Sequence, residues 1–176
     1  MPDDNARLRV RIAGVEDVDA IVRLVNLAFR VERFFIERDR TDAANTLKRF
    51  DSGTYLLGED EARALVASVY VELRGERGYF GLLAVDPSKQ RYGYGRFMVD
   101  QAEDYCRKAG CRVMDLTVVN LRAELPPYYR RLGYSESGEF PFAAEAVPKL
   151  PCHFIRMSKP LDESLDGFRS GRLPSH

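Results

Sequence analysis

The N-terminal part of the chain changes its hydrophobic period as it proceeds. Residues 8–12 alternate between apolar residues and arginines, and this period of two predicts a strand with one buried face. From residue 16 to residue 29 the apolar positions recur at helical spacing behind two acidic residues, which predicts an amphipathic helix. After a stretch that mixes aromatic and charged residues, Thr41 is placed to cap a short helix through Phe50.

Strand-like segments dominate the middle of the chain. Residues 54–57, 64–73 and 79–85 are rich in β-branched and aromatic residues. Short glycine-containing segments at residues 58–60 and 75–78 separate these strands and are typical of hairpin turns. Three consecutive antiparallel strands are therefore expected.

A helix and a further strand come next. Apolar residues share one helical face from Met98 to Ala109, and Gly110 stands where a left-handed cap would end the helix. Residues 113–119 are short, apolar and β-branched. Because they follow a strand and its crossover helix, they are expected to lie parallel to the strand at residues 79–85.

The last elements are weaker in pattern. Pro126 and Pro127 suit the first turn of a helix that Gly133 closes, and strands are expected at residues 134–140 and 153–157.

Together these patterns predict one mixed α/β (α+β) domain over residues 7–159. Its sheet has about seven strands, largely antiparallel with one parallel pair, flanked by about four helices. Residues 160–176 are polar and are expected to form a tail.

Composition narrows the possible functions. Lys plus Arg and Asp plus Glu both number 27, so no net charge draws the chain toward nucleic acid or an anionic membrane. The three cysteines, Cys106, Cys111 and Cys152, lack zinc-site spacing and read as reduced thiols, and no metal is expected. No apolar stretch approaches the length of a membrane span and the N-terminus lacks signal-peptide features, so a cytoplasmic location is expected.

One short segment carries the most specific chemistry. It lies between an apolar run and a helix-patterned segment, and its sequence is Gln90-Arg91-Tyr92-Gly93-Tyr94-Gly95. Two glycines separated by one residue let the main chain turn sharply and approach a ligand closely. The helix that begins there directs unpaired N–H groups toward the turn, so an anion such as a pyrophosphate is the expected ligand.

Two other glycine-turn chemistries fit less well. A Walker A loop needs Lys and then Ser or Thr after its last glycine, but Arg96 and Phe97 follow Gly95. A dinucleotide fingerprint needs a third glycine where this chain has Met98, and Asp115 falls inside its strand, away from the strand end that would hold a ribose.

The segment resembles the Q/R-x-x-G-x-G/A signature of the GNAT superfamily of acyl-CoA-dependent N-acetyltransferases. Two neighbouring segments strengthen the resemblance. Leu82-Leu83-Ala84-Val85-Asp86-Pro87 resembles the cofactor-contacting strand, and Tyr129-Arg130-Arg131-Leu132-Gly133-Tyr134 resembles the downstream Y-x-x-x-G-F/Y segment. The order of elements also agrees from about residue 7 to about residue 159. The resemblance implies the GNAT fold, in which the one parallel pair splays apart, and acetyl-CoA as cosubstrate.

The resemblance also implies a set of site residues. A main-chain N–H near Val85 would face the thioester carbonyl in the gap between the splayed strands, and the Tyr129 hydroxyl would be the general acid. Its reference pKa of about 10 keeps a proton available at neutral pH. Tyr128 is the alternative, because the interval after Asn120 is longer than usual and contains two prolines. The implied cofactor-binding set is Leu83, Ala84, Val85, Gln90, Arg91, Tyr92, Gly93, Tyr94, Gly95, Arg96, Asn120 and Tyr129.

The sequence leaves the general base and the role of Asn120 unassigned. Glu72 and His153 are candidates for the general base, although a solvated carboxylate and a strand histidine are the simpler interpretations. Asn120 would hydrogen-bond the pantetheine arm or else cap a turn.

Specificity is expected in residues 30–40 and 140–151. In the first of these segments, an acidic or aromatic amine could be received by Arg30, Phe34, Phe35 and Arg40, unless these residues simply continue a solvated helix.

The favoured hypothesis is an enzyme that moves an acetyl group from acetyl-CoA to a primary amine of a metabolite, antibiotic or protein. A noncatalytic acyl-CoA-binding module is the main alternative, and a nucleotide-binding domain of another fold is a third. The chain is expected to be a monomer or a homodimer.

Overall fold

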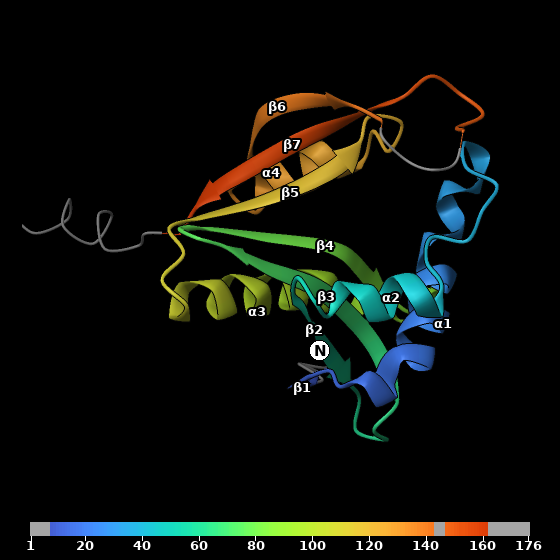
Figure 1. Cartoon of the computed structure of the whole chain (residues 1–176), viewed down its shortest axis with the longest axis vertical. Helices are drawn as coiled ribbons and strands as arrows, with labels where there is room; N and C mark the ends of the chain where they lie inside the picture. The colour runs from blue at the N-terminus through green and yellow to red at the C-terminus, as the bar shows by residue number, and fades with distance from the viewer. Residues whose placement is uncertain (1–7, 143–146, 162–176) are drawn as a thin grey trace, which may run out of the picture.

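A computed structural model describes residues 8–142 and 147–161 and contains one mixed sheet of seven strands. The order across the sheet is β1-β2-β3-β4-β5-β7-β6 (Figure 1). The strands are β1 (Arg9–Ile12), β2 (Thr54–Glu59), β3 (Leu65–Arg74), β4 (Arg77–Val85), β5 (Val113–Val119), β6 (Ser135–Pro141) and β7 (His153–Pro160). The α-helices are α1 (Val18–Ala28), α2 (Ala43–Arg49), α3 (Tyr94–Lys108) and α4 (Leu125–Arg131), and the 3₁₀ helices are η1 (Val15–Asp17), η2 (Phe29–Phe34) and η3 (Pro87–Tyr92).

Most expected elements are confirmed with small changes at their ends. The helix after the first loop is capped by Asp42, whose carboxylate accepts from the Asn45 N–H, so the prediction that Thr41 caps it was wrong. Thr41 instead exchanges hydrogen bonds with the Asn26 side chain. The first hairpin turn follows Glu59, because β2 continues through the residues expected to turn. Nearly all of the expected tail, residues 162–176, lies outside the described residues.

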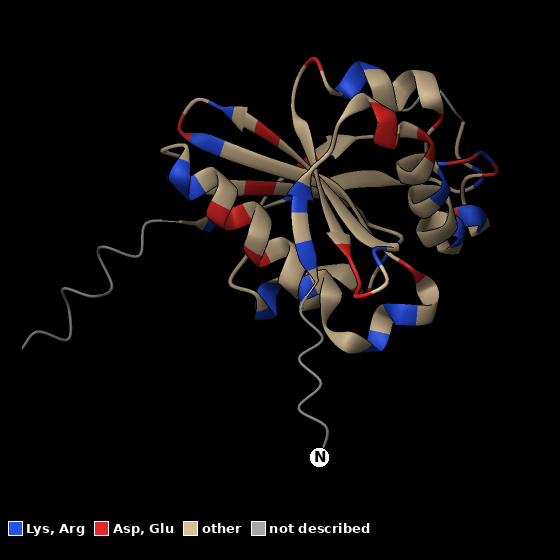
Figure 2. Cartoon of the chain, turned by 90° about the horizontal axis from the view of Figure 1, so that it is seen from below, with Lys and Arg blue, Asp and Glu red and all other residues tan. Residues whose placement is uncertain are grey.

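The sheet has an apolar core on each face. Helix α3 covers one face, where Met98 and Cys106 pack among Phe80 and Met114. Helix α1 covers the other face, where Ile21 packs in a cluster with residues of β2, β3 and β4. Basic and acidic residues are interspersed over the outside (Figure 2), as the balanced charge suggests. Within the described residues, no helix is long and apolar enough to cross a bilayer.

The parallel pair β4 and β5 is joined at only one end. Their pairing runs from Arg77 opposite Val113 to Tyr79 opposite Asp115 and then stops, although both strands continue. Beyond that point the two strands diverge (Figure 1). The predicted parallel and splayed pair is therefore confirmed, and its open end leaves a gap through the middle of the sheet.

A charged clip lies where the pairing stops. The Arg77 guanidinium donates from Nε and one terminal nitrogen to the two Asp115 oxygens at 2.7 Å each. The Ser158 hydroxyl of β7 donates to the same carboxylate at 2.5 Å. Burial opposes ionisation of Asp115, but the hydrogen bonds from Arg77 and Ser158 outweigh it and hold its pKa below the ordinary value. The clip thus joins β4, β5 and β7 at the closed end of the gap.

We predict that Asp115→Asn lowers the free energy of unfolding at pH 7 by about 1 to 2 kcal/mol, because it weakens charge-assisted hydrogen bonds at a buried position. A carboxyl with a depressed folded pKa stabilises the fold above its unfolded pKa of about 3.9, and this stabilisation is lost as pH falls through the folded pKa. Urea unfolding of both proteins at pH 7 and near pH 3 would measure the difference, which should shrink at the lower pH.

The exposed pair of Asp104 with Arg107 supplies the control. Asp104→Asn should change stability far less, because exposed ion pairs contribute little. A loss for Asp115→Asn that is equally large at both pH values would contradict the role given to its ionised form.

Candidate functional site

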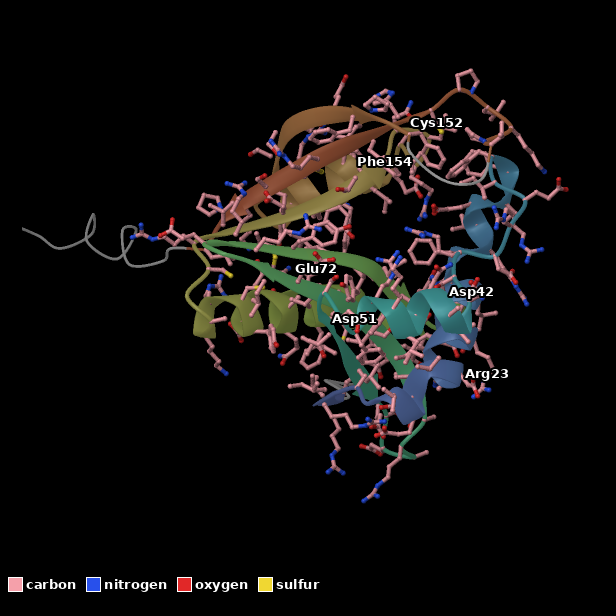
Figure 3. All side chains as sticks on the ribbon, viewed as in Figure 1. Arg23, Asp42, Asp51, Glu72, Cys152 and Phe154 are labelled. Carbon is pink, nitrogen blue, oxygen red and sulfur yellow. The ribbon has the colours of Figure 1, made fainter. Side chains whose placement is uncertain are left out.

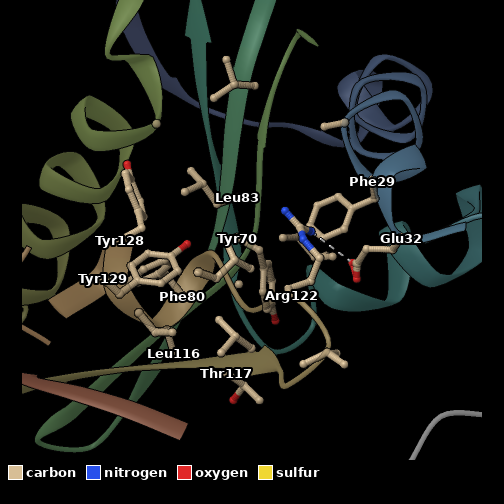
Figure 4. A pocket seen from close by; sticks show the side chains of 18 of the residues that line it. Phe29, Glu32, Tyr70, Phe80, Leu83, Leu116, Thr117, Arg122, Tyr128 and Tyr129 are labelled. Carbon is tan, nitrogen blue, oxygen red and sulfur yellow. Dashed lines mark ion pairs between the residues drawn. The ribbon is translucent and has the colours of Figure 1, made fainter. Parts of the chain in front are cut away.

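A cleft of about 630 Å³ occupies the gap between the diverging strands. It runs from the N-terminus of α3, past β4, β5 and α4, to η2 and the C-terminal end of α2 (Figure 4). Its walls are apolar in the middle, where Leu83, Val85 and Leu116 line it. Both ends carry charged side chains, so the cleft offers an apolar channel between two polar sites.

The glycine turn forms one end of this cleft. Gly93 has a φ of 75°, the left-handed conformation that glycine adopts without strain, and it is the N-cap of α3 with no side chain capping the helix. A Cβ placed on Gly95 would lie 3.4 Å from the Tyr128 hydroxyl and 3.9 Å from Val85. These are ordinary van der Waals contacts, whereas a Cβ on Gly93 would meet no atom within 4 Å, so the turn before α3 borders open space.

The charges at this end favour an anion. Arg96 and Arg131 line the cleft near Tyr128. Burial raises the pKa of the Tyr128 hydroxyl, and both guanidinium groups oppose that shift. The positive end of the α3 dipole adds to their field. The two carboxylates that line the cleft, Glu32 and Glu124, lie at the other end of the cleft, where both contact Arg122. The turn is thus suited to a diphosphate.

A bulge in β4 determines which side chains face the gap. Leu82 has a φ of 50°, and the pairing of β4 with β3 shifts register between Ser68 and Tyr70. After the bulge, Leu83 packs with the α3-side core, whereas Leu82 and Ala84 pack with the α1-side core. Leu83 and Val85 therefore line the cleft, while the Ala84 side chain points to the opposite face.

Two adjacent tyrosines project from α4 toward the cleft (Figure 4). Tyr129 is 6% exposed, packs against Phe80 and Tyr134, and its hydroxyl has no hydrogen-bond partner among the described residues. Burial raises its pKa well above the ordinary value, and the neighbouring Tyr128 adds to the shift. Tyr128 is half-buried and lies over Gly95. Tyr128 thus borders the glycine turn, and Tyr129 presents a protonated hydroxyl beside the apolar channel.

The other end of the cleft contains an ion pair that the sequence analysis did not single out. Glu32 of η2 lies 3.6 Å from Arg122, and both side chains are largely buried. Desolvation raises the pKa of Glu32, although Arg40 and Arg122 oppose the shift. Glu32 follows Phe29 by three residues, and residues three apart in a 3₁₀ helix share a face. That spacing was the sequence signal that could have placed Glu32 beside Phe29 in the cleft.

The structure brings together only part of the expected site. Seven of the expected residues line the cleft: Leu83, Val85, Gln90, Gly93, Gly95, Arg96 and Tyr129. Five do not: Ala84, Arg91, Tyr92, Tyr94 and Asn120.

Each of these five has another local role. Arg91 and Tyr92 belong to η3, and the Tyr92 ring stacks on Tyr94 at 5.6 Å. The Asn120 side chain accepts from the His153 N–H at 2.8 Å, so it links the end of β5 to the start of β7 and does not cap the turn that follows it. Contacts of these residues with a cofactor stay a prediction.

The structure also gives the positions of the candidate base residues and of the expected specificity segments. Glu72 is ion-paired with Arg74 and lines an adjoining hollow, whereas His153 lies 3.8 Å from Glu139 and lines neither cavity. Phe35 is fully buried. Arg40 is the member of its expected group that lines the cleft. Residues 143–146 of the expected specificity segment 140–151 lie outside the described residues.

Comparison with known proteins gives a consistent result. The profile described as Acetyltransferase (GNAT) family matches residues 18–134. The mycothiol acetyltransferase of Propionibacterium freudenreichii is 29% identical over 126 residues, which are 68% of this chain and 40% of that protein. The chain therefore spans less than half the length of this relative.

Solved structures share the fold at low sequence identity. A GNAT superfamily phosphinothricin acetyltransferase from Sinorhizobium meliloti, in complex with acetyl-CoA, has a TM-score of 0.68 at 17% identity, covering 89% of this chain and 90% of its own. The ribosomal-protein-S18-alanine N-acetyltransferase from Escherichia coli has a TM-score of 0.69 at 17% identity, covering 88% and 94%.

We predict that Gly93→Glu weakens acetyl-CoA binding by at least about 100-fold, because it places a negative charge in the diphosphate turn. Isothermal titration calorimetry of the variant measures this directly. Gly110→Glu is a matched control, since Gly110 also has a positive φ with open space around it but follows the other end of α3. Unchanged affinity in Gly93→Glu, or an equal loss in Gly110→Glu, would contradict the assignment.

Proposed function

Because the chain belongs to the GNAT acetyltransferase family, we propose that it transfers an acetyl group from acetyl-CoA to a primary amine of a small acceptor. The transfer is a direct attack within a ternary complex, without an acylated enzyme. The observation that carries this proposal is the continuous cleft that joins the glycine turn, the gap between β4 and β5, and the charged end beside η2. Such a channel can receive a thioester from one end and an amine from the other.

The residues of the cleft suit coenzyme A. The uncapped N-terminus of α3 and Arg96 would hold the diphosphate, and the open space beside Gly93 leaves room for it. Leu83, Val85 and Leu116 offer an apolar path for the pantetheine arm. When bound, acetyl-CoA supplies an acetyl group activated as a thioester.

The protein contributes charge stabilisation and a proton. A main-chain N–H at Val85 would donate to the thioester carbonyl oxygen as negative charge develops on it. Tyr129 would protonate the departing thiolate: its hydroxyl has no partner among the described residues, and its raised pKa keeps it protonated until the thiolate forms. The apolar residues around the channel exclude water, which protects the thioester from hydrolysis.

An amine acceptor is supported by the activity in the name of the Escherichia coli protein with the same fold, a ribosomal-protein-S18-alanine N-acetyltransferase. The alternative is a module that binds acyl-CoA without turnover.

The two functions are distinguished by measuring thiol release from acetyl-CoA across a panel of amines. We predict amine-dependent release of free thiol, together with N-acetylated product identified by mass spectrometry. Tight binding of acetyl-CoA with no release for any amine would support the noncatalytic module.

We predict that Tyr129→Phe lowers kcat by about tenfold to 100-fold, because it removes a general acid. The affinity for acetyl-CoA should barely change, since the ring and its packing remain. Tyr134→Phe is the matched control, because Tyr134 packs against Tyr129 with an unpartnered buried hydroxyl but does not line the cleft. Full activity in Tyr129→Phe would assign the proton to Tyr128 or to solvent.

A further inference from the structure

We call the end of the cleft beside η2 and Arg122 the acceptor end, because the amine would enter there. A second hollow of about 750 Å³ adjoins it. Phe154 borders it on the side of β7, and Glu72 and Asp42 border it on the opposite side (Figure 3). The side chains that line both cavities include three charged groups and three aromatic rings: Glu32, Arg40, Arg49, Phe29, Tyr70 and Phe154. Any acceptor that reaches the thioester from this side passes these residues.

The two arginines of this shared surface are not contacted directly by any carboxylate of the part of the chain that the structure describes. Neither Arg40 nor Arg49 forms a salt bridge with any residue that the structure describes, and the Nε of Arg49 is buried without a hydrogen-bond partner. Arg40 stays accessible to solvent through the open hollow. A guanidinium that is partly removed from water without a partner is costly, so these groups are poised to bind an anion.

The neighbouring carboxylates are already engaged. Glu32 lies against Arg122, and Arg122 also binds Glu124. Glu72 is held by Arg74, and Asp42 caps α2. Glu32 acts on Arg40 only through its electric field, so no acidic group of the described residues contacts either guanidinium group directly.

Aromatic rings orient both guanidinium groups. Arg40 lies over the Phe29 ring at 5.4 Å, and Arg49 lies over the Tyr70 ring at 5.3 Å. Stacking covers one face of a guanidinium and leaves the N–H groups at its edge to donate. Those edge donors match the two oxygens of a carboxylate.

We propose that the acceptor is a small amine that also carries a carboxylate, such as a free amino acid, and that Arg40 and Arg49 bind this carboxylate. The inference rests on the proposed function, because it identifies the class of molecule that the acceptor end receives. Glu32 contacts Arg122 through one oxygen at 3.6 Å, and its other oxygen, at the same end, is placed to receive the ammonium group of the acceptor. A zwitterion thus meets charges of both signs within one surface.

The test compares each of the common amino acids with its own α-amide, which keeps the amine and removes the carboxylate charge. Calorimetric titration into protein saturated with coenzyme A gives affinity without turnover, and thiol release from acetyl-CoA gives kcat and KM. At least one amino acid should bind about tenfold or more tightly than its amide, as expected for charged hydrogen bonds.

Variants link this preference to the two arginines. Arg40→Gln and Arg49→Gln should each raise the KM for the amino acid by about tenfold or more while the affinity for acetyl-CoA stays within about twofold. Arg30→Gln removes the same charge from η2 at a residue that lines neither hollow, and it should change neither value. Arg49→Lys keeps the charge but not the planar fork, so it should bind with intermediate affinity even if the glutamine variant is unstable.

The possible failures are distinguishable. If acetyl-CoA does not bind, or no amine of any kind is acetylated, the proposed function fails and this inference with it. If the amides bind or react as well as the amino acids, or Arg30→Gln matches the effect of Arg40→Gln, only the carboxylate assignment is overturned.

Discussion

The Asp115 carboxylate, held by Arg77 and Ser158, lies at the point on which the rest of the site depends. It joins β4, β5 and β7 where the parallel pairing stops, so the two parallel strands are fastened at one end and free to diverge at the other. Where the two strands diverge, their edges no longer pair with each other and face an open space. The helices on either side then close that space into a cleft with an apolar middle. A sheet paired along its whole length would have no such opening.

Electrostatics gives the two ends of the cleft related tasks. At one end the N-terminus of α3 and Arg96 present fixed positive charge to a group that carries several negative charges. At the other end Arg40 and Arg49 present guanidinium groups that are stacked on aromatic rings and are not contacted directly by any carboxylate of the described structure. The middle holds Tyr129, whose raised pKa keeps its proton in place. In the proposed function, this arrangement would separate binding at the two ends from chemistry at the centre.

Sequence patterns predicted the fold well because each element carries a local signal. The parallel strand at residues 113–119, the sharp turn at Gly93 and the left-handed cap at Gly110 follow from periodicity and from the backbone conformations that glycine permits. The acceptor end was harder to predict, because Glu32 and Arg122 are 90 positions apart in the chain numbering and meet only in the folded protein. Some residues of the expected cofactor set do not line the cleft for a related reason: a motif names consecutive residues, but the β4 bulge and η3 direct some of them elsewhere, and their contacts with a cofactor stay a prediction.

Backbone amide chemical shifts during titration with acetyl-CoA would test the central claim most directly. The account predicts the largest ¹⁵N and ¹H shifts at Gly93, Gly95 and Arg96, with further shifts at Val85 along the gap. Saturating acetyl-CoA that leaves these amides unshifted, or that shifts only residues outside the cleft, would contradict it.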